Sequence, residues 1–222
     1  MLRTLEPELM LDPDQAIAYA EADFSESDAR FVQRFKDLFG ASLEGEIIDL
    51  GCGPGNITLR MADAFPGCAI TGIDGAAPML EIARRRALGM SNPSSNPRFV
   101  EAILPNVTLP AGKVAAVVSN SLLHHLHDPL VLWQTIRQVA APGAAVLIAD
   151  LRRPETTALA QRIVDTYAGS EPEILRKDFY NSLLAAFEVN EVKKQLGMSG
   201  LANLEARAVG DRYVEVSGRM TG

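Results

Sequence analysis

The feature that most constrains this chain is a short apolar run that leads directly into a loop with three glycines at alternate positions. The run covers residues 47–50, and the glycines are Gly51, Gly53 and Gly55. Glycine permits a positive φ and lets the backbone approach a ligand with no Cβ in between, so this strand-to-helix junction favours a nucleotide-like ligand. A dinucleotide fingerprint would need its third glycine at Asn56. Without a ligand, the same loop would be a plain tight turn.

A second strand-like run ends in an acidic residue. It covers residues 69–73 and closes with Asp74, roughly twenty positions after the glycine loop, where a carboxylate can accept hydrogen bonds from both ribose hydroxyls of a bound nucleoside. The structural alternative is that Asp74 only caps the helix that begins near Ala76.

Strand-like and helix-like segments alternate along the chain, which predicts a parallel sheet packed between helices. Asp128 is expected to cap the third helix after the glycine loop, with Pro129 at its first position. Residues 89–97 are rich in proline, serine and asparagine and predict a loop. Strand patterns fall near 46–50, 69–74, 97–101, 114–120 and 144–150. Helical patterns fall near 56–65, 77–88, 129–141, 155–168, 172–188 and 190–196.

The end of the chain carries a hairpin pattern instead of another strand and helix. Leu204, Ala206 and Ala208 alternate with polar residues, and Gly210-Asp211 predicts a two-residue turn before the next strand. The expected fold is therefore α/β and Rossmann-like, with three layers and a mostly parallel seven-stranded sheet that ends in an antiparallel hairpin. A dehydrogenase nucleotide-binding domain has no reason to end in this way.

The charge balance argues against a nucleic-acid partner. The net charge is -7 and the isoelectric point is near 5.0. A surface that binds the phosphate backbone of a nucleic acid needs clustered basic side chains instead. The basic triplet at residues 84–86 is interpreted as the solvated face of a helix. No apolar run of about eighteen residues and no leader pattern are visible, so no membrane span is expected. Cys52 and Cys68 lack motif spacing and are predicted to be free thiols in a cytoplasmic protein.

Together, these motifs resemble those of the class I S-adenosylmethionine-dependent methyltransferases, in the broad type 11 and quinone-biosynthesis-like group. The alternate glycines are similar to motif I, the segment 74–80 is similar to motif II with a departure at Ala76, and the family also ends its sheet in an antiparallel pair. The resemblance implies S-adenosylmethionine as cofactor and S-adenosylhomocysteine as product. It also implies methyl transfer to a small-molecule acceptor by in-line displacement, driven mainly by positioning.

The resemblance further implies which residues contact the cofactor. Asp74 would hold the ribose, Met79 would lie against the adenine, and the ring of Tyr19 or Phe24 would face the sulfonium cation, with a purely structural role for these two rings as the alternative. Ala102 stands where relatives place an acid, so either Glu101 or the backbone at residues 102–103 would read the adenine. The predicted cofactor-binding set is Tyr19, Asp49, Gly51, Cys52, Gly53, Asn56, Asp74, Gly75, Met79, Ala102, Ile103, Asn120 and His125.

The first 43 residues predict two short helices. Asp12 precedes a proline and is a helix cap, and residues 31–39 carry one apolar stripe. In the methyltransferase family that the chain resembles, such an N-terminal helical segment packs over the cofactor and the substrate. We therefore expect residues 1–43 to form a helical cap over this site, and residues 44–222 to form one globular S-adenosylmethionine-binding methyltransferase domain.

Histidines gather after the fourth strand. His124, His125 and His127 precede Asp128, in a segment that looks like the family signature Leu-His-His-x-x-Asp. No metal site is expected, because adjacent side chains diverge on a turning backbone and no separate Glu or Cys completes a tetrahedral set. A histidine here can act as a general base or can shape the pocket. His125 is the catalytic candidate, with pocket shape as its favoured role.

Two other functional classes stay open from the sequence. A non-catalytic S-adenosylmethionine-binding protein would keep the same glycine loop, and the substitution at Ala102 is compatible with it. A nucleotide-dependent oxidoreductase fits less well, because it would need a glycine at Asn56 and no terminal hairpin. The sequence identifies neither the methyl acceptor nor the oligomeric state, for which a homodimer is one option.

Overall fold

The structure is a computed structural model that describes residues 1–90, 96–109 and 111–221. The strands are β1 (Gly45–Leu50), β2 (Cys68–Asp74), β3 (Arg98–Glu101), β4 (Val114–Asn120), β5 (Ala140–Leu151), β6 (Glu205–Val209) and β7 (Tyr213–Arg219). The helices are α1 (Pro13–Glu21), α2 (Ser25–Phe39), α3 (Asn56–Ala64), α4 (Ala77–Ala87), α5 (Leu130–Val139), α6 (Thr157–Tyr167), α7 (Glu173–Ala185) and α8 (Val189–Met198). A short 3₁₀ turn, η2 (Leu123–His125), follows β4.

The strands form one seven-stranded sheet in the order β3-β2-β1-β4-β5-β7-β6. β1 to β5 pair in parallel, and β7 pairs antiparallel with both β5 and β6. The predicted fold class and the terminal hairpin are confirmed. The strand order reverses between β1 and β4, and open α/β sheets bind ligands beyond the carboxyl ends of their strands at such a point.

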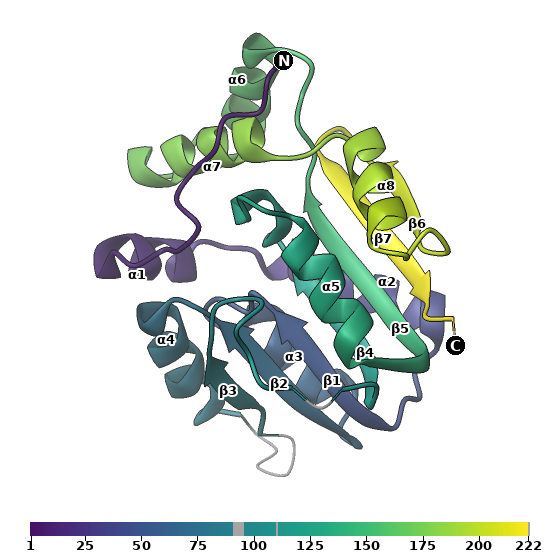
Figure 1. The fold of residues 1–222 in the computed structure, drawn as a ribbon. Helices are drawn as coiled ribbons and strands as arrows, with labels where there is room; N and C mark the ends of the chain where they lie inside the picture. The colour runs from purple at the N-terminus through teal and green to yellow at the C-terminus, as the bar shows by residue number, and fades with distance from the viewer. Residues whose placement is uncertain (91–95, 110, 222) are drawn as a thin grey trace.

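Helices cover both faces of the sheet (Figure 1). On one face, α5 and α8 pack on inward side chains such as Ile48 and Val146; on the other, α2 and α3 pack on Ile47 and Leu147. Successive strand residues point to opposite faces, which is why neighbouring apolar residues serve different cores. Trp133 is fully buried in the first core.

The remaining elements gather beyond the carboxyl ends of the strands. α6 and α7 pack together with Leu151 at the end of β5, while α1 packs on Met79 of α4. The N-terminal segment runs from the region of α6 and α7 down to α1 (Figure 1). These elements therefore stand around the part of the sheet where a ligand is expected.

Some predicted boundaries are wrong in detail. The hairpin turn has three residues, 210–212, because Val209 pairs directly with Tyr213. The third residue, Arg212, stacks on the ring of Tyr213, with its guanidinium carbon 4.7 Å from the ring centroid. The loop predicted at 89–97 falls partly on residues 91–95, which lie outside the described residues. Within the part of the chain that the structure describes, no helix is long and apolar enough to cross a membrane.

Candidate functional site

The glycine loop joins β1 to α3 and has positive φ at all three of its glycines. The φ angles of Gly51, Gly53 and Gly55 are 70°, 52° and 84°. A Cβ at Gly51 would lie 2.7 Å from the side chain of Leu122, whereas a Cβ at Gly53 would meet no atom within 4 Å. Gly51 is therefore required by packing inside the protein. Gly53 instead leaves open space in front of the loop, which a ligand could fill.

Asp74 at the end of β2 holds this loop. Its Oδ2 accepts a hydrogen bond from the backbone N–H of Gly53 at 2.8 Å, and its Oδ1 accepts one from Ala76 at 2.8 Å. Burial raises the pKa of this carboxyl, and the backbone N–H groups of Ala76, Gly53 and Gly75 oppose that rise. Each carboxylate oxygen can accept a second hydrogen bond, so Asp74 both orders the loop and keeps acceptor capacity for a ligand hydroxyl.

Asp49, the last acid of β1, is almost fully buried behind the loop. Its Oδ2 accepts a hydrogen bond from the Thr58 hydroxyl at 2.6 Å. Burial raises the pKa of Asp49 to about 7, and the nearby Asp74 carboxylate adds to the rise while Thr58 opposes it. A buried acid without a cationic partner favours its neutral form.

Arg86 corrects one interpretation of the sequence. The guanidinium does not simply face solvent: Nη1 donates to the carbonyl of Pro54 at 3.2 Å and to Oδ1 of Asn56 at 2.7 Å. Its Nη2 also donates to the carbonyl of Ala20 at the end of α1. Arg86 thus ties the glycine loop to the N-terminal helices. The sequence of the basic triplet could not reveal these contacts, because the partners of Arg86 lie far from it along the chain.

The predicted adenine end lies beside β3. Ala102 and Ile103 line the cleft, and the Ala102 N–H donates to the carbonyl of Asp74 at 2.9 Å. Glu101 is exposed and is not among the lining residues. This placement favours backbone reading of the adenine at residues 102–103 over a contact from the Glu101 side chain.

A cleft of about 1540 Å³ runs along the carboxyl edge of the sheet. Ligand sites typically measure about 300–1,000 Å³, so the cleft has room for two small molecules side by side. All thirteen predicted cofactor residues line it, namely Tyr19, Asp49, Gly51, Cys52, Gly53, Asn56, Asp74, Gly75, Met79, Ala102, Ile103, Asn120 and His125.

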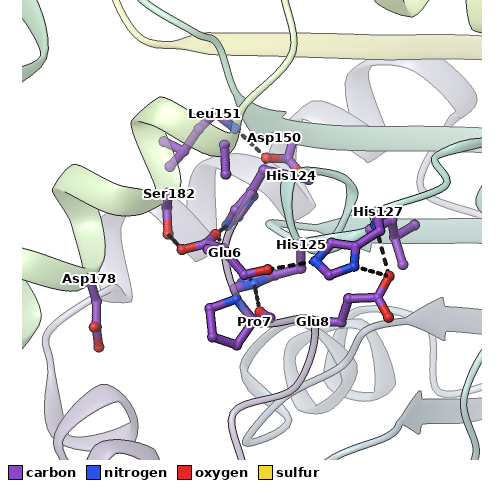
Figure 2. Close-up of polar contacts among 12 residues, drawn as sticks. Glu6, Pro7, Glu8, His124, His125, His127, Asp150, Leu151, Asp178 and Ser182 are labelled. Carbon is purple, nitrogen blue, oxygen red and sulfur yellow. Dashed lines mark hydrogen bonds and ion pairs between the residues drawn. The ribbon is translucent and has the colours of Figure 1, made fainter. Parts of the chain in front are cut away.

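The histidine segment departs from its predicted geometry. The rings of His124 and His125 do not diverge: their centroids are 4.1 Å apart. Glu6, from the N-terminal segment, places Oε1 3.5 Å from His124 Nε2 and 3.4 Å from His125 Nδ1. Figure 2 shows Glu6 reaching the two imidazoles. The topology thus brings a separate glutamate from a remote part of the chain to this segment, which the sequence did not predict.

Asp150 at the end of β5 orients the first of these rings. Its Oδ1 lies 2.5 Å from His124 Nδ1, and both side chains are almost fully buried. Burial alone would lower the pKa of His124, but Asp150 and then Glu6 raise it overall. Burial, followed by the neighbouring His124, lowers the pKa of His125 to about 3. His125 is therefore neutral near pH 7.

The N-terminal segment is anchored across this end of the cleft. The guanidinium of Arg3 donates to the carbonyls of His124 and Leu126, each at 2.9 Å, and lies 3.9 Å from the ring centroid of Phe187. The backbone N–H of Thr4 donates to the carbonyl of Leu184 at 3.0 Å. Sequence patterns missed Arg3, Glu6 and His124 as site residues. The only local signal was the histidine run itself.

Comparison with known proteins matches residues 47–143 to a family model described as a methyltransferase domain. The chain is similar to trans-aconitate 2-methyltransferase of Sinorhizobium fredii, with 35% identity over 47% of this chain and 37% of the relative. It is also similar to demethylmenaquinone methyltransferase of Thermus thermophilus, with 30% identity over 58% and 57% of the two chains. The chain thus spans less than two thirds of the length of either relative.

Solved structures share the whole fold at low identity. An S-adenosylmethionine-dependent methyltransferase structure from Methanococcus maripaludis aligns over 100% of this chain and 99% of its own, with a TM-score of 0.71 and 15% identity. Phosphoethanolamine N-methyltransferase 2 of Haemonchus contortus, solved with S-adenosylhomocysteine, aligns over 88% of this chain and 43% of its own, with a TM-score of 0.67 and 16% identity. At these identities the likeness shows the architecture.

Proposed function

Because this chain carries a methyltransferase domain of the class I S-adenosylmethionine-dependent family, we propose that it transfers the methyl group of S-adenosylmethionine to a small-molecule acceptor. One observation carries the proposal. The open space in front of Gly53 and the Asp74 carboxylate lie on the same cleft, at the point where the strand order reverses. The cleft is also large enough for an acceptor beside the cofactor.

The residues of this cleft fit the cofactor part by part. A ligand backbone can lie against Gly53 with no Cβ in the way, and the ribose hydroxyls can donate to Asp74. Met79 is buried at the start of α4 and lies on the cleft where an adenine would pack. Tyr19 forms an aromatic pair with Phe24, with 5.0 Å between ring centroids, and presents an aromatic surface suited to a cation.

Catalysis in this proposal depends on position. The sulfonium of the cofactor supplies an already activated methyl group, so the chain must hold the acceptor in line and exclude water. Correct placement alone can supply on the order of 7–11 kcal/mol. The helical cap of residues 1–43 and α7 would close the cleft over the acceptor, and neutral His125 would shape the pocket near the transferred group.

The acceptor itself is proposed only as a class. The relatives named above methylate trans-aconitate or demethylmenaquinone by their names, and both are small organic molecules. The matched region stops at residue 143, whereas α6, α7 and the N-terminal segment that surround the acceptor end of the cleft lie outside it. The match therefore leaves the identity of the acceptor open within the class of small organic molecules.

Calorimetry with S-adenosylhomocysteine tests the first half of the proposal. We expect saturable 1:1 binding, together with thermal stabilisation by S-adenosylhomocysteine and none by NAD or NADP. Stabilisation by a nicotinamide cofactor alone would contradict the proposal and favour an oxidoreductase. Acceptor screening for release of S-adenosylhomocysteine tests the second half. Binding without release across a broad panel of small hydroxy, carboxy and amino acceptors would favour a non-catalytic binding protein.

A further inference from the structure

The Glu6 side chain holds a buried carboxylate oxygen that lacks a hydrogen-bond partner among the described residues. Its Oε1 is buried and unpaired, while Oε2 accepts from the Ser182 hydroxyl at 3.3 Å. Only 10% of the side chain is exposed. Leaving such an oxygen unpaired costs about 1–3 kcal/mol, more for a charged group. The position of Oε1 between two imidazoles therefore indicates a missing cationic partner.

The imidazole of His124 presents a lone pair to the same point. Nδ1 lies 2.5 Å from the Asp150 carboxylate, so the Nδ1 proton is donated there and Nε2 of the neutral ring is an acceptor. Nε2 faces Glu6 Oε1 at 3.5 Å. Two buried acceptors that face each other at this distance need a shared positive charge between them, which either a proton or a metal cation can supply.

His125 supplies a third ligand atom. Its Nδ1 lies 3.4 Å from Glu6 Oε1, and it also lies 3.3 Å from the carbonyl of Pro7. The contact with Pro7 is longer than the usual N–H···O distance of about 2.9–3.0 Å, so giving up that contact would cost little. The side chain reaches the cleft on its partly exposed side.

We propose that Glu6, His124 and His125 bind a divalent transition-metal cation of the zinc class, with Asp150 as the outer carboxylate and one coordination position open to the cleft. The ligand atoms of the three residues lie within 4.8 Å of one another. Bonds of about 2.0–2.1 Å at tetrahedral angles place ligand atoms roughly 3.3–3.5 Å apart. The two distances from Glu6 Oε1, 3.5 and 3.4 Å, match that spacing.

The chemistry of the ligand set supports the same cation class. Two imidazoles and one carboxylate suit zinc and related first-row metals, and such sites keep a further position for water or substrate. A histidine that binds a metal usually donates its other N–H to a carboxylate, as His124 does to Asp150 (Figure 2). Calcium and magnesium prefer all-oxygen sites and fit less well.

The open position gives the metal site a place in the proposed function. The three ligands line the same cleft as Gly53 and Asp74, so an oxygen or nitrogen of the acceptor could bind the metal there. This role rests on the proposed methyl transfer, whereas metal binding itself does not. A protonated His124 that bridges Asp150 and Glu6 without any metal is the competing arrangement.

The test is calorimetric titration of the chelator-treated full-length protein with Zn²⁺, supported by the visible absorption of Co²⁺. We expect one high-affinity equivalent and a tetrahedral-type cobalt spectrum. Asp150→Asn removes the outer carboxylate and should weaken Zn²⁺ binding by about 10- to 100-fold. Glu6→Gln and His125→Ala each change a ligand and should weaken Zn²⁺ binding by at least as much. Glu8→Gln is the matched control, because this exposed carboxylate lies beside the site, 3.8 Å from His127 Nδ1, and the substitution should leave Zn²⁺ affinity unchanged.

Three results would overturn the inference. These are no Zn²⁺ binding by the unmodified protein, equal binding by Glu6→Gln, or an equal loss of affinity in the control Glu8→Gln, which would indicate an adventitious surface site. S-adenosylhomocysteine affinity is measured on the same samples, so that a failed metal site is distinguished from a failed cofactor site. Circular dichroism and the Tm of each variant show whether it is folded.

Discussion

Replacing Gly53 by alanine tests whether the cofactor lies against the glycine loop. In the protein alone, the new Cβ meets no atom within 4 Å, so its only cost is the left-handed backbone at φ +52°. That conformation costs an ordinary residue about 1–2 kcal/mol. For a chain of this size, each kcal/mol lowers Tm by about 2–4 °C, so the expected fall is about 2–8 °C.

Gly143→Ala is the matched control. Gly143 has a φ of +80° and open space at its Cβ position, and it is an exposed residue near the start of β5. The variant should lose the same stability while keeping its ligand affinity. Gly51→Ala is a poor test, because its Cβ would lie 2.7 Å from the side chain of Leu122 and would disturb folding.

Calorimetry with S-adenosylhomocysteine then separates the loss of folding stability, caused by the backbone conformation, from the loss of ligand affinity, caused by the added Cβ. An added methyl group in a close-packed contact costs about 1–3 kcal/mol, which predicts an affinity loss of about 5- to 150-fold for Gly53→Ala. Gly53→Val, with a larger side chain, should abolish binding while the protein stays folded. If Gly53→Ala and Gly143→Ala match in both Tm and affinity, the glycine serves the turn alone and the reasoning fails.

Three further predictions concern the same region and the core. Asp74→Ala should weaken S-adenosylhomocysteine binding by about 1.5–3 kcal/mol, because ribose hydroxyls lose a charged acceptor, and unchanged affinity by calorimetry would remove Asp74 from the site. The second prediction concerns Asp49, whose pKa is about 7 in the folded chain, so that the folded chain binds the carboxyl proton more tightly than the unfolded chain does. The free energy of unfolding should therefore fall by up to about 4 kcal/mol as the pH rises from about 4 to 7. Asp49→Asn should flatten that slope in urea titrations, and an unaltered slope would contradict the raised pKa. Trp133→Phe removes the buried hydrogen bond from Nε1 to Gln195 Oε1, which is 2.9 Å long. The variant should lose about 1–3 kcal/mol of unfolding free energy, and a urea midpoint equal to that of the wild type would contradict this prediction.

The local parts of the site were predictable from the sequence. Three alternate glycines after an apolar run specify a strand, a turn with positive φ and a helix, since each requirement acts within a few residues. The position of Asp74 followed in the same way, because it closes the next strand of a parallel sheet. The thirteen predicted residues line one cleft for this reason, and their binding of the cofactor stays a prediction.

Boundaries and charge runs were harder to predict. The hairpin loop has one residue more than predicted, because Val209 and Tyr213 pair in register. The alternation of apolar residues does not fix the length of such a loop. Within the basic triplet, Arg86 donates to carbonyls and an amide of other elements. Helical periodicity says which face a residue occupies but not what the rest of the chain places against that face.

What the sequence by itself determined is the order of strands and helices, the glycine loop and the acid that closes β2. Only the tertiary structure decided that Glu6 meets the two imidazoles and that Asp150 orients one of them. It also decided how strongly burial moves the pKa of Asp49. Local propensity acts between near neighbours, whereas the contacts of Glu6 and the desolvation of Asp49 depend on which remote segments the fold brings together and on how much water it removes.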